Sequence, residues 1–435
     1  MNSFKAEERF VETVLRDVET YRKDHEWMKE EVLRSEAYYK GKPVPFLYMP
    51  RLITPWQLED FRSIVKKSNG IFEKVIQRYE NDARYRAAFA FPKLMEELIL
   101  LPTPLEWSIP MARYDIFYRG KGDFTFCEIN TDGTSAMNED RTFAEIMLRS
   151  KAGAILAPMD PKPFELFHSW VDSFIGHFGE GELKRVAILD IGKLEDNFEF
   201  LRFRDTFREA GISCDLANPE DLIFDGEWLT QNGERVDAIY RRLVTSDFFR
   251  DLEDHMHLVE AMQTGKTVWV GPIKTQIIHN KRIFYVLHLE EFSDMFTEEE
   301  NAFIKTHIPF TTELKKEMIT DEFLDEKDHW LLKPPDYYAA KGVIAGRKAS
   351  REEWKAAMEK GADEGVLLQR FAEVPTFRCV DFDAEGDTDL YHHVTGLFVY
   401  NGEFAGVFSR AGLQEMIAEQ YGARTLPTYG VKDVE

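Results

Sequence analysis

The sequence predicts a mixed α/β protein with an antiparallel core, a small parallel α/β subdomain and a helical N-terminal lobe. Two β-forming runs, residues 112–119 and 124–130, flank Gly-Lys-Gly-Asp, a connection of hairpin length. After Arg185, apolar strand patterns alternate with helical patterns, which is typical of a parallel sheet. In the first hundred residues, apolar positions recur at helical spacing.

The composition is that of a folded chain with an acidic balance. Of 435 residues, 44% are hydrophobic, and 55 basic residues against 78 acidic ones give a net charge of −23. This charge argues against a general nucleic-acid or anionic membrane surface, although a local basic cleft could still hold phosphates. The length exceeds what one core usually supports, so two or three subdomains are expected.

The cysteines and the hydropathy pattern bear on the compartment. Cys127, Cys214 and Cys379 show neither disulfide nor zinc spacing, which favours a reducing environment. The N-terminal residues lack the apolar core of a signal peptide, and no apolar run is long enough to cross a bilayer. We therefore expect a soluble cytoplasmic protein. Its oligomeric state is left open by the sequence.

Residues 1–105 are expected to form the helical lobe. Phe10 and Val14 begin its apolar spacing, and four prolines interrupt it around the apolar segment PFLYMP. His25 and Trp27 have no partners at metal-ligand spacing, so we expect structural roles for them.

The hairpin carries a polar face. A turn centred on its Lys-Gly dipeptide predicts three pairs across the strands: Arg113 with Asn130, Asp115 with Glu128, and Phe117 with Phe126. The other face would be apolar, with Tyr114, Ile116, Tyr118, Cys127 and Ile129. Because opposed carboxylates destabilise a strand pair, a divalent cation such as Mg²⁺ would explain them. The alternative is an exposed face on which Arg113 neutralises the acids.

A polar loop, TDGTSAMNED, leads from the hairpin into a helical pattern. Thr134 and Ser135 could contact a substrate there, or could cap the helix. Residues 106–165 would form this part of the core, and prolines around residues 158–163 would end it.

Residues 184–275 are predicted to form the parallel subdomain. No GxGxxG motif follows its first strand, VAILDI, so a dinucleotide site is not indicated. Arg241 and Arg242 end its last strand. Because carboxyl ends of parallel strands face the ligand crevice, one arginine could reach a substrate carboxylate, or could form a surface salt bridge.

Two lysines stand out in residues 276–435. Lys281 starts an apolar segment, and Lys333 ends the strand-like run WLLK before two prolines. The loop-like segment 336–342 follows.

The last strands are GVLLQRF, residues 365–371, and a hairpin with Asn-Gly as its turn that ends at Arg410. His392 and His393 have no acidic or cysteine neighbours at ligand spacing, so we expect them at the surface.

Together these motifs resemble the ATP-grasp ligases. Arg-x-Asp on one strand and Glu-x-Asn on its partner resemble the metal-binding pair of that superfamily, and the two lysines resemble its nucleotide ligands. In ordinary members the Glu-x-Asn strand follows the lysines, whereas here it precedes them. This order resembles the circularly permuted ATP-grasp family that includes the synthetase domain of glutathionylspermidine synthase. The resemblance begins near Trp107.

The resemblance implies an ATP-grasp core in residues 106–165 and 276–435, with residues 184–275 as its Rossmann-like pre-ATP-grasp subdomain. It implies Mg²⁺ ligands at Asp115, Glu128 and Asn130, and catalytic arginines at Arg113 and Arg410. It implies ATP contacts at Lys281, Lys333, Lys341, Gly342, Gln369, Arg370 and Phe371, with residues 336–342 as a lid. Thr134 and Ser135 would contact the substrate.

The activity that the resemblance implies is an ATP- and Mg²⁺-dependent ligase joining a small-molecule carboxylate to an amine through an acyl phosphate. Three alternatives remain: a ligase with an aminoacyl-tRNA partner, which the acidic charge disfavours without excluding, a non-catalytic nucleotide-binding regulatory protein, and a kinase-like phosphotransferase.

Overall fold

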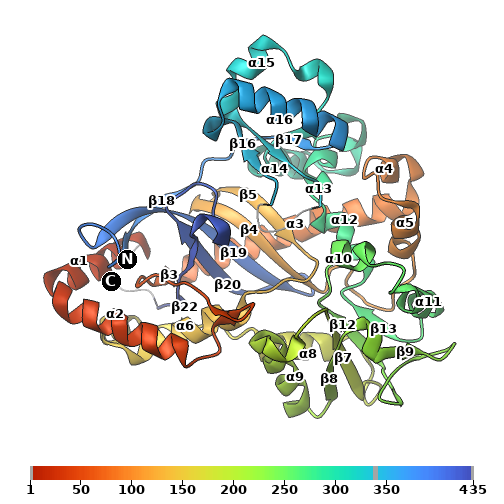
Figure 1. Cartoon of the computed structure of the whole chain (residues 1–435), viewed down its shortest axis with the longest axis horizontal. Coiled ribbons are helices and arrows are strands. Elements are labelled where there is room, and N and C mark those ends of the chain that lie inside the picture. The colour runs from red at the N-terminus through yellow and green to blue at the C-terminus, as the bar shows by residue number, and fades with distance from the viewer. Residues whose placement is uncertain (1–2, 337–340, 433–435) are drawn as a thin grey trace.

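The computed structural model describes residues 3–336 and 341–432. It is a mixed α/β fold in which a central antiparallel sheet lies between a small sheet and a parallel sheet (Figure 1). The expected fold class is confirmed. The small sheet, with helices α15 (Asp321–Asp325) and α16 (Arg351–Glu364), stands at the top of Figure 1.

The central sheet joins segments from distant parts of the chain. Its order is β21 (Arg424–Thr425), β20 (Glu403–Gly412), β19 (Thr388–Tyr400), β4 (Met111–Gly120) and β5 (Asp123–Asn130), and β18 (Thr376–Val380) also pairs with β19. The predicted hairpin β4–β5 therefore lies beside the predicted hairpin β19–β20.

The predicted register holds at the open end of the β4–β5 hairpin. Arg113 lies opposite Asn130, and Asp115 opposite Glu128. The prediction that Phe117 pairs with Phe126 is wrong, because the register shifts after Asp115.

A bulge explains the shift. Cys127 has no cross-strand partner among the described pairs, so Ile116 lies opposite Phe126 and Phe117 opposite Thr125. Cys127 therefore leaves the apolar face expected for it and packs near Phe117 on the other face. Phe126 instead joins Ile116 in the main core.

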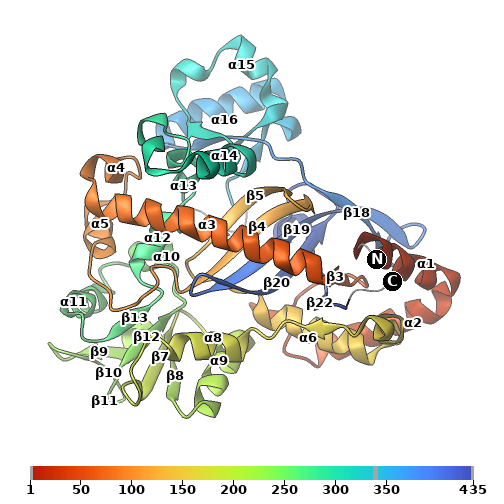
Figure 2. The same cartoon turned by 180° about the vertical axis from the view of Figure 1, so that it is seen from behind.

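Helix α3 (Pro55–Asn81) covers the back of the central sheet (Figure 2). Its apolar stripe, including Phe61, Phe72 and Val75, packs in one core with Tyr114 and Ile116 of β4. Pro55 begins the helix after the capping residue Thr54, which is where proline is tolerated best. The polar side chains of Arg113, Asp115, Glu128 and Asn130 consequently lie on the other face of the sheet.

The expected parallel sheet is present. Its order is β13 (Val268–Val270), β12 (Ala238–Arg241), β7 (Arg185–Leu189) and β8 (Ser213–Ala217), and every pairing is parallel. Helices α8 (Phe167–Ile175), α9 (Phe198–Glu209) and α11 (Met256–Thr264) flank it, with a side sheet of β9 (Leu222–Phe224), β10 (Leu229–Gln231) and β11 (Glu234–Arg235).

The small antiparallel sheet has a core of its own, around Trp330 and Trp354. Its order is β14 (Thr311–Glu313), β17 (Leu367–Arg370), β15 (Trp330–Lys333) and β16 (Ile344–Ala345). Because side chains alternate along β15, Trp330 and Leu332 enter this core while Leu331 and Lys333 face the central sheet.

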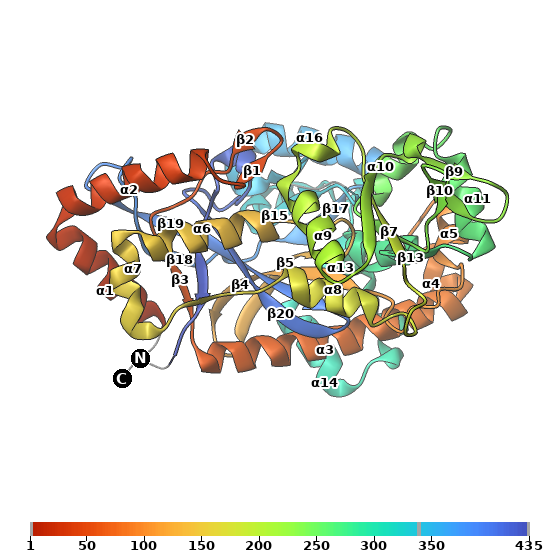
Figure 3. The same cartoon turned by 90° about the horizontal axis from the view of Figure 1, so that it is seen from below.

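The N-terminal helices α1 (Ser3–Arg16) and α2 (Val18–Leu33) form a second core with α6 (Met137–Arg149) and α7 (Lys151–Leu156) (Figure 3). The last strand, β22 (Thr428–Gly430), pairs in parallel with β3 (Arg51–Ile53) and antiparallel with β6 (Lys162–Pro163). The remaining elements are β1 (Tyr38–Tyr39), β2 (Lys42–Pro43), α4 (Ala83–Ala87), α5 (Lys93–Ile99), α10 (Thr245–Arg250), α12 (Gln276–His279), α13 (Arg282–Val286) and α14 (Glu298–His307).

Two histidine expectations have different outcomes. His25 has the structural role expected, buried among the rings of Phe46, Tyr48 and Phe382. The prediction that His393 lies at the surface is wrong, because it is 1% exposed and packs edge-on against Phe377. In the part of the chain that the structure describes, no helix is both long and apolar enough to span a membrane.

A buried ion pair ties α1 to β3. Glu7 binds Arg51 at 2.9 Å and accepts the Leu52 backbone N–H at 3.0 Å, and both charged residues are buried. Glu7→Gln should lower the free energy of unfolding by about 3 kcal/mol, because the guanidinium loses its counter-charge in a dry site. Glu8→Gln, at the exposed neighbour, should stay within about 0.5 kcal/mol. Urea unfolding of both variants measures this, and equal effects would contradict it.

Candidate functional site

A cavity of about 1020 Å³ runs along the polar face of the central sheet. That volume is at the upper end of what small-molecule sites occupy. The central sheet forms one wall and the small sheet another, through Leu331, Lys333 and Gln369. The first turn of α6, the loops after β7 and β12, residues 38–45 and the segment after β20 line its other sides. The site therefore lies where several parts of the fold meet.

Arg113, Asp115 and Asn130 form a hydrogen-bonded group on the sheet wall. Arg113 donates to both oxygens of Asp115, from Nε at 2.6 Å and from Nη2 at 2.9 Å. Asn130 Nδ2 donates to Asp115 Oδ2 at 3.1 Å. The side chains of Arg113 and Asp115 are each 11% exposed, so the exposed polar face considered from sequence is wrong. The neutralising role of Arg113 is present nonetheless.

Glu128 pairs with Lys281. The Lys281 Nζ lies 3.0 Å from Glu128 Oε1, and Lys281 immediately precedes α13. Burial alone would raise the pKa of Glu128, but the charges of Lys281 and Lys333 outweigh it and lower that pKa to about 2. The opposition of Asp115 and Glu128 is therefore balanced by cations of the chain itself, so the repulsion alone does not require a metal ion.

Lys333 lies at the bulge in β5. Its Nζ donates to the backbone carbonyl of Cys127 at 3.0 Å. Cys127 is the bulged residue, and a bulge removes a carbonyl from the regular ladder and re-aims it. Burial is the main reason why the pKa of Lys333 is lowered, and the positive charge of Lys281 adds to this effect. Two mutually repelling lysines thus converge beside Glu128.

Arg410 approaches from β20. Arg113 and Arg410 both lie over the ring of Phe408, at 5.0 and 5.2 Å from its centroid. Burial and the charge of Arg113 lower the pKa of Arg410. Between these strands, Gly396 of β19 pairs with Asp115 and leaves room for the ion pair.

The loop after β5 reaches the cavity without capping α6 through a side chain. The α6 N-cap is Ala136, in the left-handed region with φ 84°. Thr134 Oγ1 donates to the Asn130 carbonyl at 3.0 Å, and the Ser135 carbonyl accepts from Arg113 at 2.7 Å. The capping alternative is therefore wrong, and both residues line the cavity.

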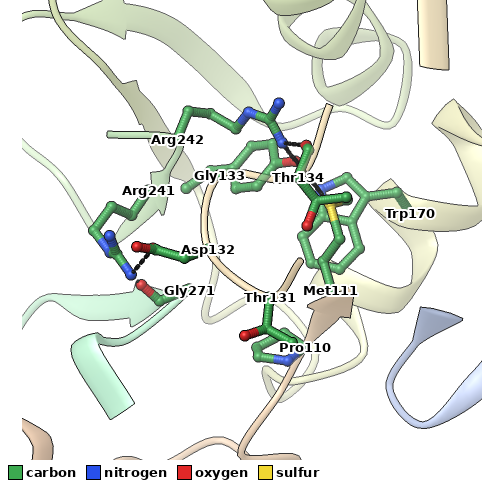
Figure 4. A pocket seen from close by; sticks show the side chains of 11 residues that line it. Pro110, Met111, Thr131, Asp132, Gly133, Thr134, Trp170, Arg241, Arg242 and Gly271 are labelled. Atoms are coloured by element: carbon green, nitrogen blue, oxygen red, sulfur yellow. Dashed lines mark hydrogen bonds and ion pairs between the residues drawn. The ribbon is translucent and has the colours of Figure 1, made fainter. Parts of the chain in front are cut away.

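The two arginines at the end of β12, Arg241 and Arg242, hold this loop in place (Figure 4). Arg241 pairs with Asp132 at 2.6 Å, and Arg242 donates to the Thr134 carbonyl. Both arginines are buried, so the surface salt bridge considered for them is wrong. A pocket of about 20 Å³ remains between them and Trp170, enough for roughly one water molecule.

Gln369, Arg370 and Phe371, at the end of β17, were expected to contact ATP, and their side chains lie on two sides of the strand. Gln369 and Phe371 line the cavity. Arg370 does not, because alternation sends it over the Trp330 ring at 4.2 Å. The backbone N–H groups of Arg370 and Phe371 already donate to other carbonyls, at 2.8 Å each. The Arg370 side chain therefore lies outside the cavity, and the predicted contact of this residue with ATP stays a prediction.

The expected lid is described only at its ends. Residues 337–340 lie outside the described residues. Lys341 and Gly342 are exposed and are not among the residues that line the cavity, although Val343 next to them is. Their predicted contact with ATP stays a prediction.

Three cavity residues were missed from sequence: Glu139, Glu199 and His279. Arg242, one of the two arginines considered for the ligand crevice, lines the cavity too. Burial is the main reason why the pKa of His279 is lowered. The position of Arg242 at a strand end indicated it in advance, whereas the three missed residues belong to no spaced motif.

Fold and site together define an α/β protein with a charged, ligand-sized cavity between two sheets. The chain belongs to the family described as glutathionylspermidine synthase preATP-grasp, whose model matches residues 53–428. Membership of this synthase family places it among ligase-type enzymes.

Solved structures resemble the chain at low identity. A glutathione synthetase-like effector from Globodera pallida is 13% identical, covers 94% of this chain and 96% of its own, and has a TM-score of 0.61. A putative gamma-glutamylcysteine synthetase from Methylobacillus flagellatus KT is 10% identical over 88% and 89% of the chains, with a TM-score of 0.40. No curated protein matches the chain.

Gly396→Ala should disturb the site directly. A Cβ at Gly396 would lie 2.7 Å from Arg113 Cδ and 2.8 Å from Asp115 Oδ1, so the ion pair would have to move. We expect a loss of about 1–3 kcal/mol in urea unfolding. Gly412→Ala is the matched control on β20, since its Cβ would meet only ordinary contacts from 3.7 Å. Equal stability of the two variants would refute the close approach.

Glu128→Gln should change stability in a pH-dependent way. Ionised Glu128 stabilises the fold fully above the ordinary value of 4.5, and this contribution is lost as the pH falls toward its folded pKa of about 2. At neutral pH we expect the variant to be less stable by about 1–3 kcal/mol, with the gap closing under acid conditions. Glu403→Gln, an exposed position on the same sheet, should show a small, constant gap. A gap for Glu128→Gln that stays constant with pH would count against the ion pair.

Proposed function

We propose that the protein is an ATP- and Mg²⁺-dependent ligase of the ATP-grasp type, which joins a carboxylate to an amine through an acyl phosphate. The observation that supports this proposal is the convergence of Glu128, Lys281 and Lys333 with Arg113 and Asp115 on one cavity wall. Transfer of a phosphoryl group needs positioning and charge neutralisation more than it needs an acid–base pair. This wall offers both signs of charge within one ligand-sized space.

The donor set fits Mg²⁺. Asp115, Glu128 and Asn130 offer carboxylate and amide oxygens from one face of the β4–β5 hairpin. Mg²⁺ typically uses one or two protein carboxylates and completes its coordination with water and substrate phosphates. These three residues would hold the ion, which would supply Lewis acidity and charge neutralisation at the phosphate oxygens.

The cations of the wall would bind the substrates. Lys281 and Lys333 would hold the phosphates of ATP, exchanging Glu128 and the Cys127 carbonyl for phosphate oxygens. Arg113 and Arg410 would neutralise charge on the transferred phosphoryl group and on the tetrahedral intermediate. Gln369 and Phe371, which line the cavity on the small-sheet wall, would contact the base.

The loop after β5 would hold the carboxylate substrate. Thr134 and Ser135 line the cavity next to Arg113, so a carboxylate bound there would face the γ-phosphoryl group beside that arginine. Lys341 and Gly342 would approach the phosphates from the segment beyond residue 336. The family name suggests glutathione and spermidine as the first carboxylate and amine to test.

ADP release is the decisive measurement. Mg²⁺-ATP with both glutathione and spermidine should release ADP, and omission of any one component should abolish it. Lys333→Met should weaken Mg²⁺-ADP binding by on the order of 10–100-fold, since a charge-assisted hydrogen bond to phosphate is lost. Lys348→Met, at an exposed lysine of the same subdomain, should change the affinity less than about twofold. Calorimetry that detects no Mg²⁺-ADP binding to the unmutated protein would refute the proposal.

A further inference from the structure

Glu139 is an acidic residue of the cavity wall. It lies in the first turn of α6 and lines the cavity together with Arg113 and Arg410. Its carboxyl group forms an ion pair with no described residue, although both arginines are near enough to act on its charge. Buried carboxylates are usually paired with a cation, so the absence of an ion pair between Glu139 and any described residue has to be explained.

The reason lies at the N-terminus of α6. Glu139 is the third residue after the N-cap Ala136, the position from which a glutamate normally folds back to accept the N-cap N–H. Here Glu199 of α9 accepts that N–H at 3.1 Å, and those of Met137 and Asn138 at 2.8 and 3.4 Å. Arg242 holds Glu199 at 2.8 Å.

Two other helices of this chain show the usual arrangement. Glu300 accepts the Thr297 N–H at 2.7 Å, and Glu353 accepts the Ser350 N–H at 2.8 Å. Glu139 occupies the same helical position, but its capping role is taken by Glu199. The Glu139 carboxyl group therefore does not cap its own helix and lies on the cavity wall.

The surroundings of Glu139 suit a group that exchanges protons near neutrality. Burial raises the pKa of Glu139 to about 7, and the negative charge of Glu199 contributes in the same direction. Arg410 of β20 and Arg113 of β4 act against this rise. On α6 itself, Asp140 is the adjacent acid. A base works best when its pKa lies near the working pH.

We propose that Glu139 is the general base that takes a proton from the amine substrate during amide formation. The proposal rests on the ligase function proposed above. The ammonium group gives one proton to the Glu139 carboxylate, and its nitrogen then forms a bond to the acyl carbon. The carbon–oxygen bond to phosphate breaks, its electron pair stays with phosphate, and the second proton leaves with that phosphate.

Hydroxylamine separates this role from others, because it is largely unprotonated at neutral pH and attacks acyl phosphates without a base. With Mg²⁺-ATP and glutathione as carboxylate, Glu139→Gln should lower amide formation with spermidine by on the order of 10²-fold. Hydroxamate formation and Mg²⁺-ADP affinity should stay within about twofold. Glu145→Gln, at an exposed glutamate of the same helix, should leave all three unchanged.

The opposite results are equally clear. If Glu139→Gln lowers both reactions equally, or neither, Glu139 is not the base. A second measurement does not depend on turnover. The difference between infrared pH titrations of the unmutated protein and of Glu139→Gln gives the pKa of the Glu139 carboxyl group. A midpoint near that of ordinary glutamate would also overturn the proposal. Absence of hydroxamate with the unmutated protein would instead refute the ligase function on which the inference depends.

Discussion

The opposition of Asp115 and Glu128 across one rung of the β4–β5 hairpin constrains much of the structure around it. Two carboxylates on a mostly buried face require nearby cations, because an uncompensated buried charge is very costly. Arg113 supplies one from two residues away on the same strand. Lys281 supplies the other from a distant segment, and its ion pair holds the start of α13 against the sheet. The neighbouring strand accommodates this cluster by placing a glycine, Gly396, beside it.

Because the charges of this site are already paired within the chain, a phosphate would bind here at the cost of existing interactions, unlike in a cleft with unpaired basic residues. Each phosphate oxygen that takes Lys281 or Lys333 must replace an acceptor that the chain already provides, Glu128 or the Cys127 carbonyl. The Glu128 carboxylate released by that exchange then needs a new positive partner. Nucleotide and divalent cation would consequently bind best together. The cation would compensate the carboxylate that the phosphates displace, and the phosphates would compensate the charge of the lysines.

The sequence predicted the parts of this site that local rules govern. Alternation and turn length placed Asp115 opposite Glu128, and an apolar run before two prolines placed Lys333 at a strand end. The bulge could not be predicted from the sequence, because the small thiol of Cys127 is compatible with either face of the sheet. The position of the Arg370 side chain follows from the same rule, since the alternation that orients Gln369 toward the cavity directs its neighbour away from it.

The rest depended on contacts between segments far apart in the sequence. No spacing connects Glu199 of α9 with the start of α6, because that contact exists only once the parallel subdomain has docked against the central sheet. One local sign was nonetheless available. Ser-x-x-Glu and Thr-x-x-Glu precede α16 and α14 and form capping boxes, whereas the start of α6 reads Ala-x-x-Glu. A glutamate at this position without a hydroxyl three residues earlier lacks half of the reciprocal cap. Such a glutamate has less reason to fold back onto its own helix, which is the condition under which its carboxyl group becomes available to a site.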